Sequence, residues 1–267
     1  MKHCILFAAG LADEGRIYIV DELMTALKEN LPNADYFVGI NTDSCAGTSE
    51  SILRHVTPVA MGTVPTAINV KPDASAFQLA MRLLRESDRR YDLYWFIHTK
   101  GGYHNRDDRR KVYIDRFIGK ASEIRMIFSE FPSLGSYGLQ GVIKRPRWKS
   151  FRNYKKDHVI DICRNIPHHG FKYTHVNWSY IDTIYAIRGE AINHFLDIAP
   201  DSFYYSRIKD LFYFETVIPW IPTRMGFFPY VETKECFRKK GNINKMTKRW
   251  IKKNKLGCEE FDCLLTL

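Results

Sequence analysis

Residues 91–102 read YDLYWFIHTKGG, a run of aromatic and β-branched residues followed at once by a histidine, a lysine and two glycines. The apolar part, residues 93–97, is typical of a buried strand of a parallel sheet. In open α/β folds, ligands bind where parallel strands end. His98 and Lys100 are two positions apart, so their side chains point to the same side if the strand continues that far. We therefore expect the functional site at the end of this strand.

Strand-like and helix-like segments alternate along the rest of the chain. The other expected strands span residues 4–9, 34–40, 54–61, 137–143, 181–187 and 226–231. The expected helices span residues 20–30, a segment capped by Asp73, and residues 107–131, 189–198 and 210–218, the last stopped by Pro219. This order predicts an α/β fold with a Rossmann-like, mainly parallel central sheet flanked by helices on both faces.

Size and composition fit one folded domain. The 267 residues are 45% hydrophobic and 14% aromatic, which excludes a disordered chain, and no apolar run is long enough to cross a bilayer. Six scattered cysteines without a CxxC pair predict reduced thiols, a cytoplasmic location and no zinc site. We expect a domain over residues 1–237 and a basic tail over residues 238–267.

The net charge of +10 comes from two short stretches. Residues 238–255 hold nine basic and no acidic residues, and residues 144–156 hold seven and none. These stretches admit three interpretations: a solvated surface, a peripheral contact with an anionic membrane or polyanion, and nucleic-acid binding. The remainder of the chain has 24 basic against 30 acidic residues and no nucleic-acid-binding motif, which disfavours the third interpretation.

The segment from Asp92 to Gly101, with Asn105, Arg106 and the long helix after it, resembles the HTK segment of rhamnan-synthesis-type glycosyltransferases. The resemblance covers about residues 90–140, and the layout is similar to the GT-A glycosyltransferase fold. Residues 183–192 and 214–219 are similar to later elements of these enzymes. The resemblance implies transfer of a sugar from a UDP-, GDP- or dTDP-sugar to a glycan or polysaccharide acceptor.

The GT-A pattern places a metal-binding DxD motif where this chain has His98-Thr-Lys100. No carboxylate pair is therefore supplied there to Mn²⁺ or Mg²⁺, which prefer oxygen ligands. One hypothesis is that Lys100 replaces the positive charge of the metal beside the departing diphosphate. The other is that His98 still contacts a metal held by the donor phosphates. Asp107 and Asp108 form a second candidate metal pair, although acidic residues at a helix start are more often dipole partners.

The resemblance assigns roles to further residues. Glu215 is the candidate general base that activates the acceptor hydroxyl, against the alternative of a solvent-facing helix residue. The donor-binding candidates are Gly10, Arg16, Asn41, Asp43, His98, Lys100 and Gly101, and the acceptor-binding candidates are Trp148, Trp178 and Arg188. Asn41 and Asp43 are equally well explained as turn residues. We expect residues 1–143 to bind the nucleotide sugar and residues 144–237 to bind the acceptor.

Two function classes remain open at this point. The first is the glycosyltransferase. The second is a non-catalytic protein on a glycosyltransferase-like fold that binds a glycan or nucleic acid through its basic stretches. The sequence contains neither GxGxxG nor GxxxxGK[ST], so dinucleotide-dependent dehydrogenases and P-loop kinases lose support.

Overall fold

A computed structural model describes residues 1–41, 47–65, 72–100, 102, 106–139, 141–143, 178–180, 182–205, 214, 217–232 and 248. Its centre is a seven-stranded sheet in the order β3-β2-β1-β4-β8-β5-β9. The strands are β1 (His3–Ala9), β2 (Asp35–Asn41), β3 (Ala60–Val64), β4 (Leu93–His98), β5 (Leu134–Gly138), β8 (Tyr185–Arg188) and β9 (Phe228–Val231). A separate antiparallel pair joins β6 (Gly141–Ile143) to β7 (Trp178–Tyr180).

The sheet is mainly parallel, as expected. Strands β1 to β4 run parallel, β8 is antiparallel to both β4 and β5, and β9 is parallel to β5. Six of the seven strands therefore point the same way, and only β8 opposes them. The chain leaves β1 for β2 and β3 on one side and returns to β4 on the other. The carboxyl ends of β1 and β4 thus form the switch point at which open α/β sheets bind ligands.

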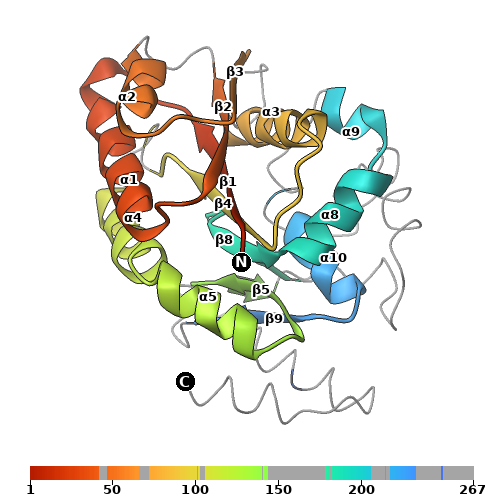
Figure 1. Cartoon of the computed structure of the whole chain (residues 1–267). Helices are drawn as coiled ribbons and strands as arrows, with labels where there is room; N and C mark the ends of the chain where they lie inside the picture. Colours follow the sequence, from red (N-terminus) through yellow and green to blue (C-terminus); the bar gives the residue numbers. More distant parts are fainter. Residues whose placement is uncertain are drawn as a thin grey trace.

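Helices cover both faces of the sheet, as Figure 1 shows. One face is covered by α3 (Pro72–Glu86), α8 (Gly189–Ile198), α9 (Asp201–Tyr205) and α10 (Ile218–Arg224). The other is covered by α1 (Ile17–Asn30), α2 (Gly47–His55), α4 (Asp107–Tyr113), the π-helical turn η2 (Ile114–Ile118) and α5 (Ala121–Glu130). A 3₁₀ turn, η1 (Glu14–Arg16), precedes α1. Because side chains alternate along each strand, the two faces bury separate apolar clusters.

Two expected elements in the first half of the chain differ from those observed. The strand predicted at 54–61 is wrong in its first half, because Arg54 and His55 end α2 and β3 begins only at Ala60. The single helix predicted at 107–131 is interrupted by η2 and Gly119, whose Cβ would lie 2.8 Å from the Asp115 carbonyl oxygen. A π-helical turn inserts a residue into the helical register and so redirects the segment that follows.

The other differences lie in the second half of the chain. The strand predicted at 137–143 is two strands in different sheets, β5 and β6. Pro219 does not stop a helix, because it occupies the first turn of α10, where a missing N–H is tolerated. The boundary between residues 237 and 238 and most of the basic tail lie outside the described residues.

Within the part of the chain that the structure describes, every helix is too short or too polar to cross a bilayer. Among the same residues, Cys4 is a free thiol buried in β1.

His3 begins β1 and is expected to make folding pH-dependent. Its ring is buried, and burial followed by the charge of Arg125 lowers the pKa of His3 from 6.5 to about 4. Between these values the unfolded chain binds the proton and the folded chain does not, so stability falls as the pH falls. We expect a loss of about 2 kcal/mol from this group between about pH 7 and about pH 5. Urea denaturation of the wild type and of His3→Phe, which cannot protonate, measures this contribution; equal losses in both would contradict it.

Candidate functional site

The carboxyl ends of β1 and β4 are joined by a dense set of hydrogen bonds. The Thr99 hydroxyl donates to the Gly10 carbonyl oxygen at 2.7 Å, and the Gly10 amide donates to the Thr99 hydroxyl at 2.9 Å. The Ala12 amide donates to the Gly102 carbonyl oxygen at 2.9 Å. A Cβ on Gly102 would lie 2.1 Å from the Gly10 carbonyl oxygen, so only glycine permits this approach. The switch point is therefore a rigid platform made by the two strand ends.

His98 is the last residue of β4 and is almost completely buried at this platform. Its ring packs against Phe77 of α3 with a centroid separation of 6.2 Å. Its Nε2 lies 2.5 Å from the carbonyl oxygen of Asp182. A carbonyl oxygen only accepts, so Nε2 carries the proton and donates. The Nε2 lone pair of His98 is consequently not available as a metal ligand.

Asp182 joins this group of side chains, although the sequence analysis did not select it. Its carboxylate accepts from the Lys100 ammonium at 2.5 Å, from Arg109 at 3.3 Å and from the Tyr113 hydroxyl at 3.3 Å. The Asp182 and Lys100 side chains are only 9% and 15% exposed. Burial alone would raise the pKa of the Asp182 carboxyl, but the charges of Lys100 and Arg109 lower it below its ordinary value. The cluster contains two cations and one carboxylate, of which Lys100 and Asp182 are largely buried and Arg109 is 34% exposed.

The backbone that carries Asp182 is strained. Asp182 and the next residue, Thr183, have φ angles of 69° and 52°, in the left-handed region that L-residues rarely adopt. Such a conformation costs about 1–2 kcal/mol per residue and is least favourable for a β-branched side chain. The strand predicted at 181–187 is therefore wrong at its start, because β8 begins only at Tyr185, after this turn.

The described residues do not fit a divalent metal. They contain no group of three or more His, Cys, Asp or Glu side chains placed to hold an ion. The Asp182 carboxylate is already paired with two cations, which would repel a third. Asp107 accepts from Arg110 at 2.7 Å within the first turn of α4, as expected of a helix-start residue rather than of a metal pair.

Two further donor-binding candidates lie at the same edge. Asn41 ends β2 beside β1 and is fully buried; its Nδ2 donates to the Ala9 carbonyl oxygen at 3.5 Å. Its Oδ1 has no hydrogen-bond partner within the described residues. Arg16 follows β1 in η1, where it forms an ion pair with Asp13 at 3.1 Å. Together with Gly10, these residues surround the strand ends.

Arg188 is not part of this group. It pairs in register with Leu93, the first residue of β4, and so lies at the opposite edge of the sheet from His98. Its guanidinium donates to the carbonyl oxygens of Phe128, Phe131 and Leu134 at 2.9, 2.8 and 2.6 Å. The carbonyls of Phe128 and Phe131 end α5 and that of Leu134 begins β5, so Arg188 closes the helix terminus and joins it to the next strand.

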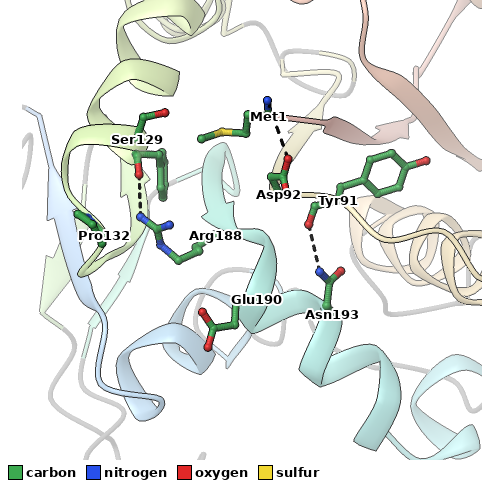
Figure 2. A pocket seen from close by; sticks show the side chains of 9 residues that line it. Met1, Tyr91, Asp92, Ser129, Pro132, Arg188, Glu190 and Asn193 are labelled. Carbon is green, nitrogen blue, oxygen red and sulfur yellow. Dashed lines mark hydrogen bonds and ion pairs between the residues drawn. The ribbon is translucent and has the colours of Figure 1, made fainter.

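A pocket of about 770 Å³ surrounds Arg188 at that opposite edge. Figure 2 shows Arg188, Glu190 and Asn193 on its wall, with the Asn193 amide donating to the Tyr91 carbonyl oxygen. This pocket is separate from the cluster of His98, Lys100 and Asp182.

The remaining candidates fall in or beside the parts of the chain outside the description. Asp43, Gly101, Trp148 and Glu215 lie outside the described residues. The backbone of Trp178 belongs to β7, where it pairs with Ile143. Arg109 and Tyr113, which sequence reasoning did not select, are one helical turn apart on α4 and both face Asp182.

Comparison with known proteins finds distant structural neighbours. No family model and no curated protein matches the chain. A solved structure of the mannosyltransferase Ktr4p from S. cerevisiae aligns at a TM-score of 0.36 and 7% identity over 97% of this chain and 80% of that one. The structure of the same enzyme in complex with GDP aligns at a TM-score of 0.36 and 8% identity, again over 97% of this chain and 80% of that one. Core-mannan synthase A from Aspergillus fumigatus, in an Mn/GDP form, aligns at a TM-score of 0.34 and 9% identity. This alignment covers 85% of this chain and 70% of that one. Similarity at this level carries no inference about function.

Proposed function

We propose that this protein is a glycosyltransferase that moves a sugar from a nucleoside-diphosphate donor to a glycan or polysaccharide acceptor. The observation that carries the proposal is the convergence of Lys100 and Arg109 beside His98 at the carboxyl ends of β1 and β4. Two cations at a topological switch point suit an anionic, nucleotide-like ligand. Because their charges exceed that of Asp182, the cluster is attractive to a diphosphate.

Each part of the donor has a matching group. Lys100 and Arg109 hold the diphosphate and neutralise the charge that grows on it as the glycosidic bond breaks. Buried Asn41 has an amide oxygen without a partner in the described residues, and this oxygen accepts from a base or ribose. Gly10 and Arg16 lie at the same end of the sheet, and the sequence adds Asp43 as a further nucleoside-binding residue. This arrangement needs no metal at the position of the DxD motif.

The acceptor side of the proposal rests on the sequence. Glu215 takes the proton of the attacking hydroxyl, and the aromatic side chains of Trp148 and Trp178 stack on the acceptor sugar. Arg188 is left out of this site, since it lies at the far edge of the sheet. The protein works in the cytoplasm, and the basic tail at 238–255 supplies a peripheral contact with an anionic membrane.

The first test is binding of nucleotides without and with metal. Thermal unfolding is measured with UDP-, GDP- and dTDP-sugars, each in EDTA and in Mn²⁺. One donor is expected to raise the melting temperature by several degrees, because a ligand of the folded state stabilises it. The increase is expected to persist in EDTA, since Lys100 and Arg109 provide the positive charge. Loss of the effect in EDTA would favour metal binding at His98 over the metal-free site.

The second candidate is a binding protein without transferase activity. It is favoured by one observation: the buried Asp182 carboxylate already neutralises part of the cationic pair. Slow release of nucleoside diphosphate from the donor that binds best distinguishes the two. Release supports the transferase, and tight binding without release supports the binding protein.

A further inference from the structure

Three hydrogen-bond donors surround the Asp182 carboxylate. The Lys100 ammonium, the Arg109 guanidinium and the Tyr113 hydroxyl all converge on one carboxylate at 2.5 to 3.3 Å. Oxygen atoms of a phosphate accept the same charge-assisted hydrogen bonds from the same donors. The Asp182 carboxylate therefore lies where a phosphoryl group would be held.

We propose that Asp182 is a tethered anion that competes with the diphosphate of the nucleotide for Lys100 and Arg109, and that this competition speeds release of the nucleoside diphosphate product. The proposal rests on the proposed function, because it takes the ligand to be a diphosphate. It assigns Asp182 neither to acid–base chemistry nor to metal binding.

The strained turn supports this role. Asp182 and Thr183 are both left-handed in φ, and such residues persist only where surrounding contacts hold them. The contacts that hold this turn are the ion pairs of the carboxylate and the hydrogen bond from His98 to the Asp182 carbonyl oxygen. The hydroxyl of Thr183 is buried and has no hydrogen-bond partner in the described part of the chain. A diphosphate that displaces the carboxylate thus replaces its ion pairs and releases strain in the backbone.

The charge state fits competition rather than catalysis. The neighbouring cations keep the pKa of Asp182 below its ordinary value although burial opposes them, so the group is an anion near neutral pH. A carboxylate stabilised in this way is a weak base. It remains a strong rival for cations that a phosphate also binds.

The decisive variant is Asp182→Asn. Isothermal titration with inorganic pyrophosphate, and with the nucleoside diphosphate that binds best, is compared between wild type and variant. We expect binding to become at least about tenfold tighter, since removing one charged rival for a cation pair changes affinity by about this factor or more. Stopped-flow dissociation of the nucleotide is expected to slow by a similar factor. Equal or weaker binding overturns the proposal, because an Asp182 that positions Lys100 for its ligand would give that result.

Asp35→Asn is the matched control. Asp35 also accepts from an arginine and a tyrosine, Arg89 at 2.7 Å and Tyr91 at 2.6 Å. It begins β2, at the opposite edge of the sheet from Lys100. The Asp35→Asn protein is expected to bind pyrophosphate as tightly as the wild type. A gain of the same size in Asp35→Asn would assign the effect to overall charge and overturn the proposal.

Asp182→Asn leaves two cations without their carboxylate and can lower stability, so a second measurement uses unfolding itself. Pyrophosphate is expected to raise the melting temperature of the variant more than that of the wild type. Sodium chloride of equal ionic strength is not expected to produce this difference. Equal increases overturn the proposal. If the wild type binds pyrophosphate but no nucleoside diphosphate, the proposed function fails while the anion site stands. If nucleotides bind and Asp182→Asn changes nothing, the tethered anion fails while the function stands.

Discussion

Replacing Lys100 by methionine is expected to weaken nucleoside-diphosphate binding by about 100-fold and to lower the transfer rate by at least as much. Lys100 is the cation closest to the Asp182 carboxylate, and its side chain is only 15% exposed. Charge stabilisation inside a water-poor site is worth more than on the surface, and loss of one such donor commonly costs 10²–10³ in rate. Titration of the nucleotide and a steady-state transfer assay measure the two effects.

Two comparison variants make this result interpretable. Lys111→Met removes the same charge from an exposed residue of α4, so it controls for the overall field and is expected to retain wild-type binding. Lys100→Met also leaves Asp182 facing the ligand with one cation fewer, and Lys100→Met with Asp182→Asn removes this repulsion. The double variant is expected to recover part of the lost affinity through Arg109. A Lys100→Met protein that binds as tightly as the wild type would exclude Lys100 from the diphosphate site.

The sequence predicted best where local pattern and burial agree. β4 and β1 are apolar runs that are buried on both faces, and α8 was predicted with its observed bounds, Gly189–Ile198. In these segments the hydrophobic period, which local sequence shows, decides the structure. The mainly parallel α/β sheet follows from their order and is confirmed.

The errors arise where contacts distant in sequence decide. β3 is a partly exposed edge strand, so burial marks its start only weakly. The turn at Asp182 and Thr183 interrupts a run that reads as a continuous strand, and ion pairs with Lys100 and Arg109, more than 70 residues away in sequence, hold it in place. Both causes depend mainly on contacts outside the local sequence.

The sequence predicted one part of the candidate site, His98 and Lys100, but not its partner Asp182, because only the first part has a clear local pattern. His98 and Lys100 follow an apolar strand and precede two glycines, and this combination marks a ligand-binding strand end. Asp182 carries one weak signal, an aspartate inside a strand-like apolar run, where that residue is unfavourable. Its pairing with Lys100 depends on β8 lying beside β4, which the sequence alone does not specify.

Substituting Gly39 by alanine is expected to destabilise the fold by about 3 kcal/mol, a large overpacking effect. Gly39 lies in the middle of β2 beneath α3, and a Cβ there would sit 1.9 Å from the Ala76 carbonyl oxygen and 2.7 Å from its carbonyl carbon. Both atoms are main chain, so no side-chain rotation relieves the overlap. The whole of α3 would have to move away from the sheet, loosening the face that holds Phe77 and, through it, His98.

Gly62 provides the matched control because it is the register partner of Gly39 on the neighbouring strand β3. A Cβ on Gly62 would lie 3.4 Å from a Leu79 methyl group, which is ordinary van der Waals contact with a side chain that can adjust. Gly62→Ala is therefore expected to stay within about 1 kcal/mol of the wild type, since alanine also reduces the entropy of the unfolded chain. Urea denaturation of both variants gives the comparison. Similar stabilities for Gly39→Ala and Gly62→Ala would contradict close packing of α3 on β2 and, with it, the buried setting of His98.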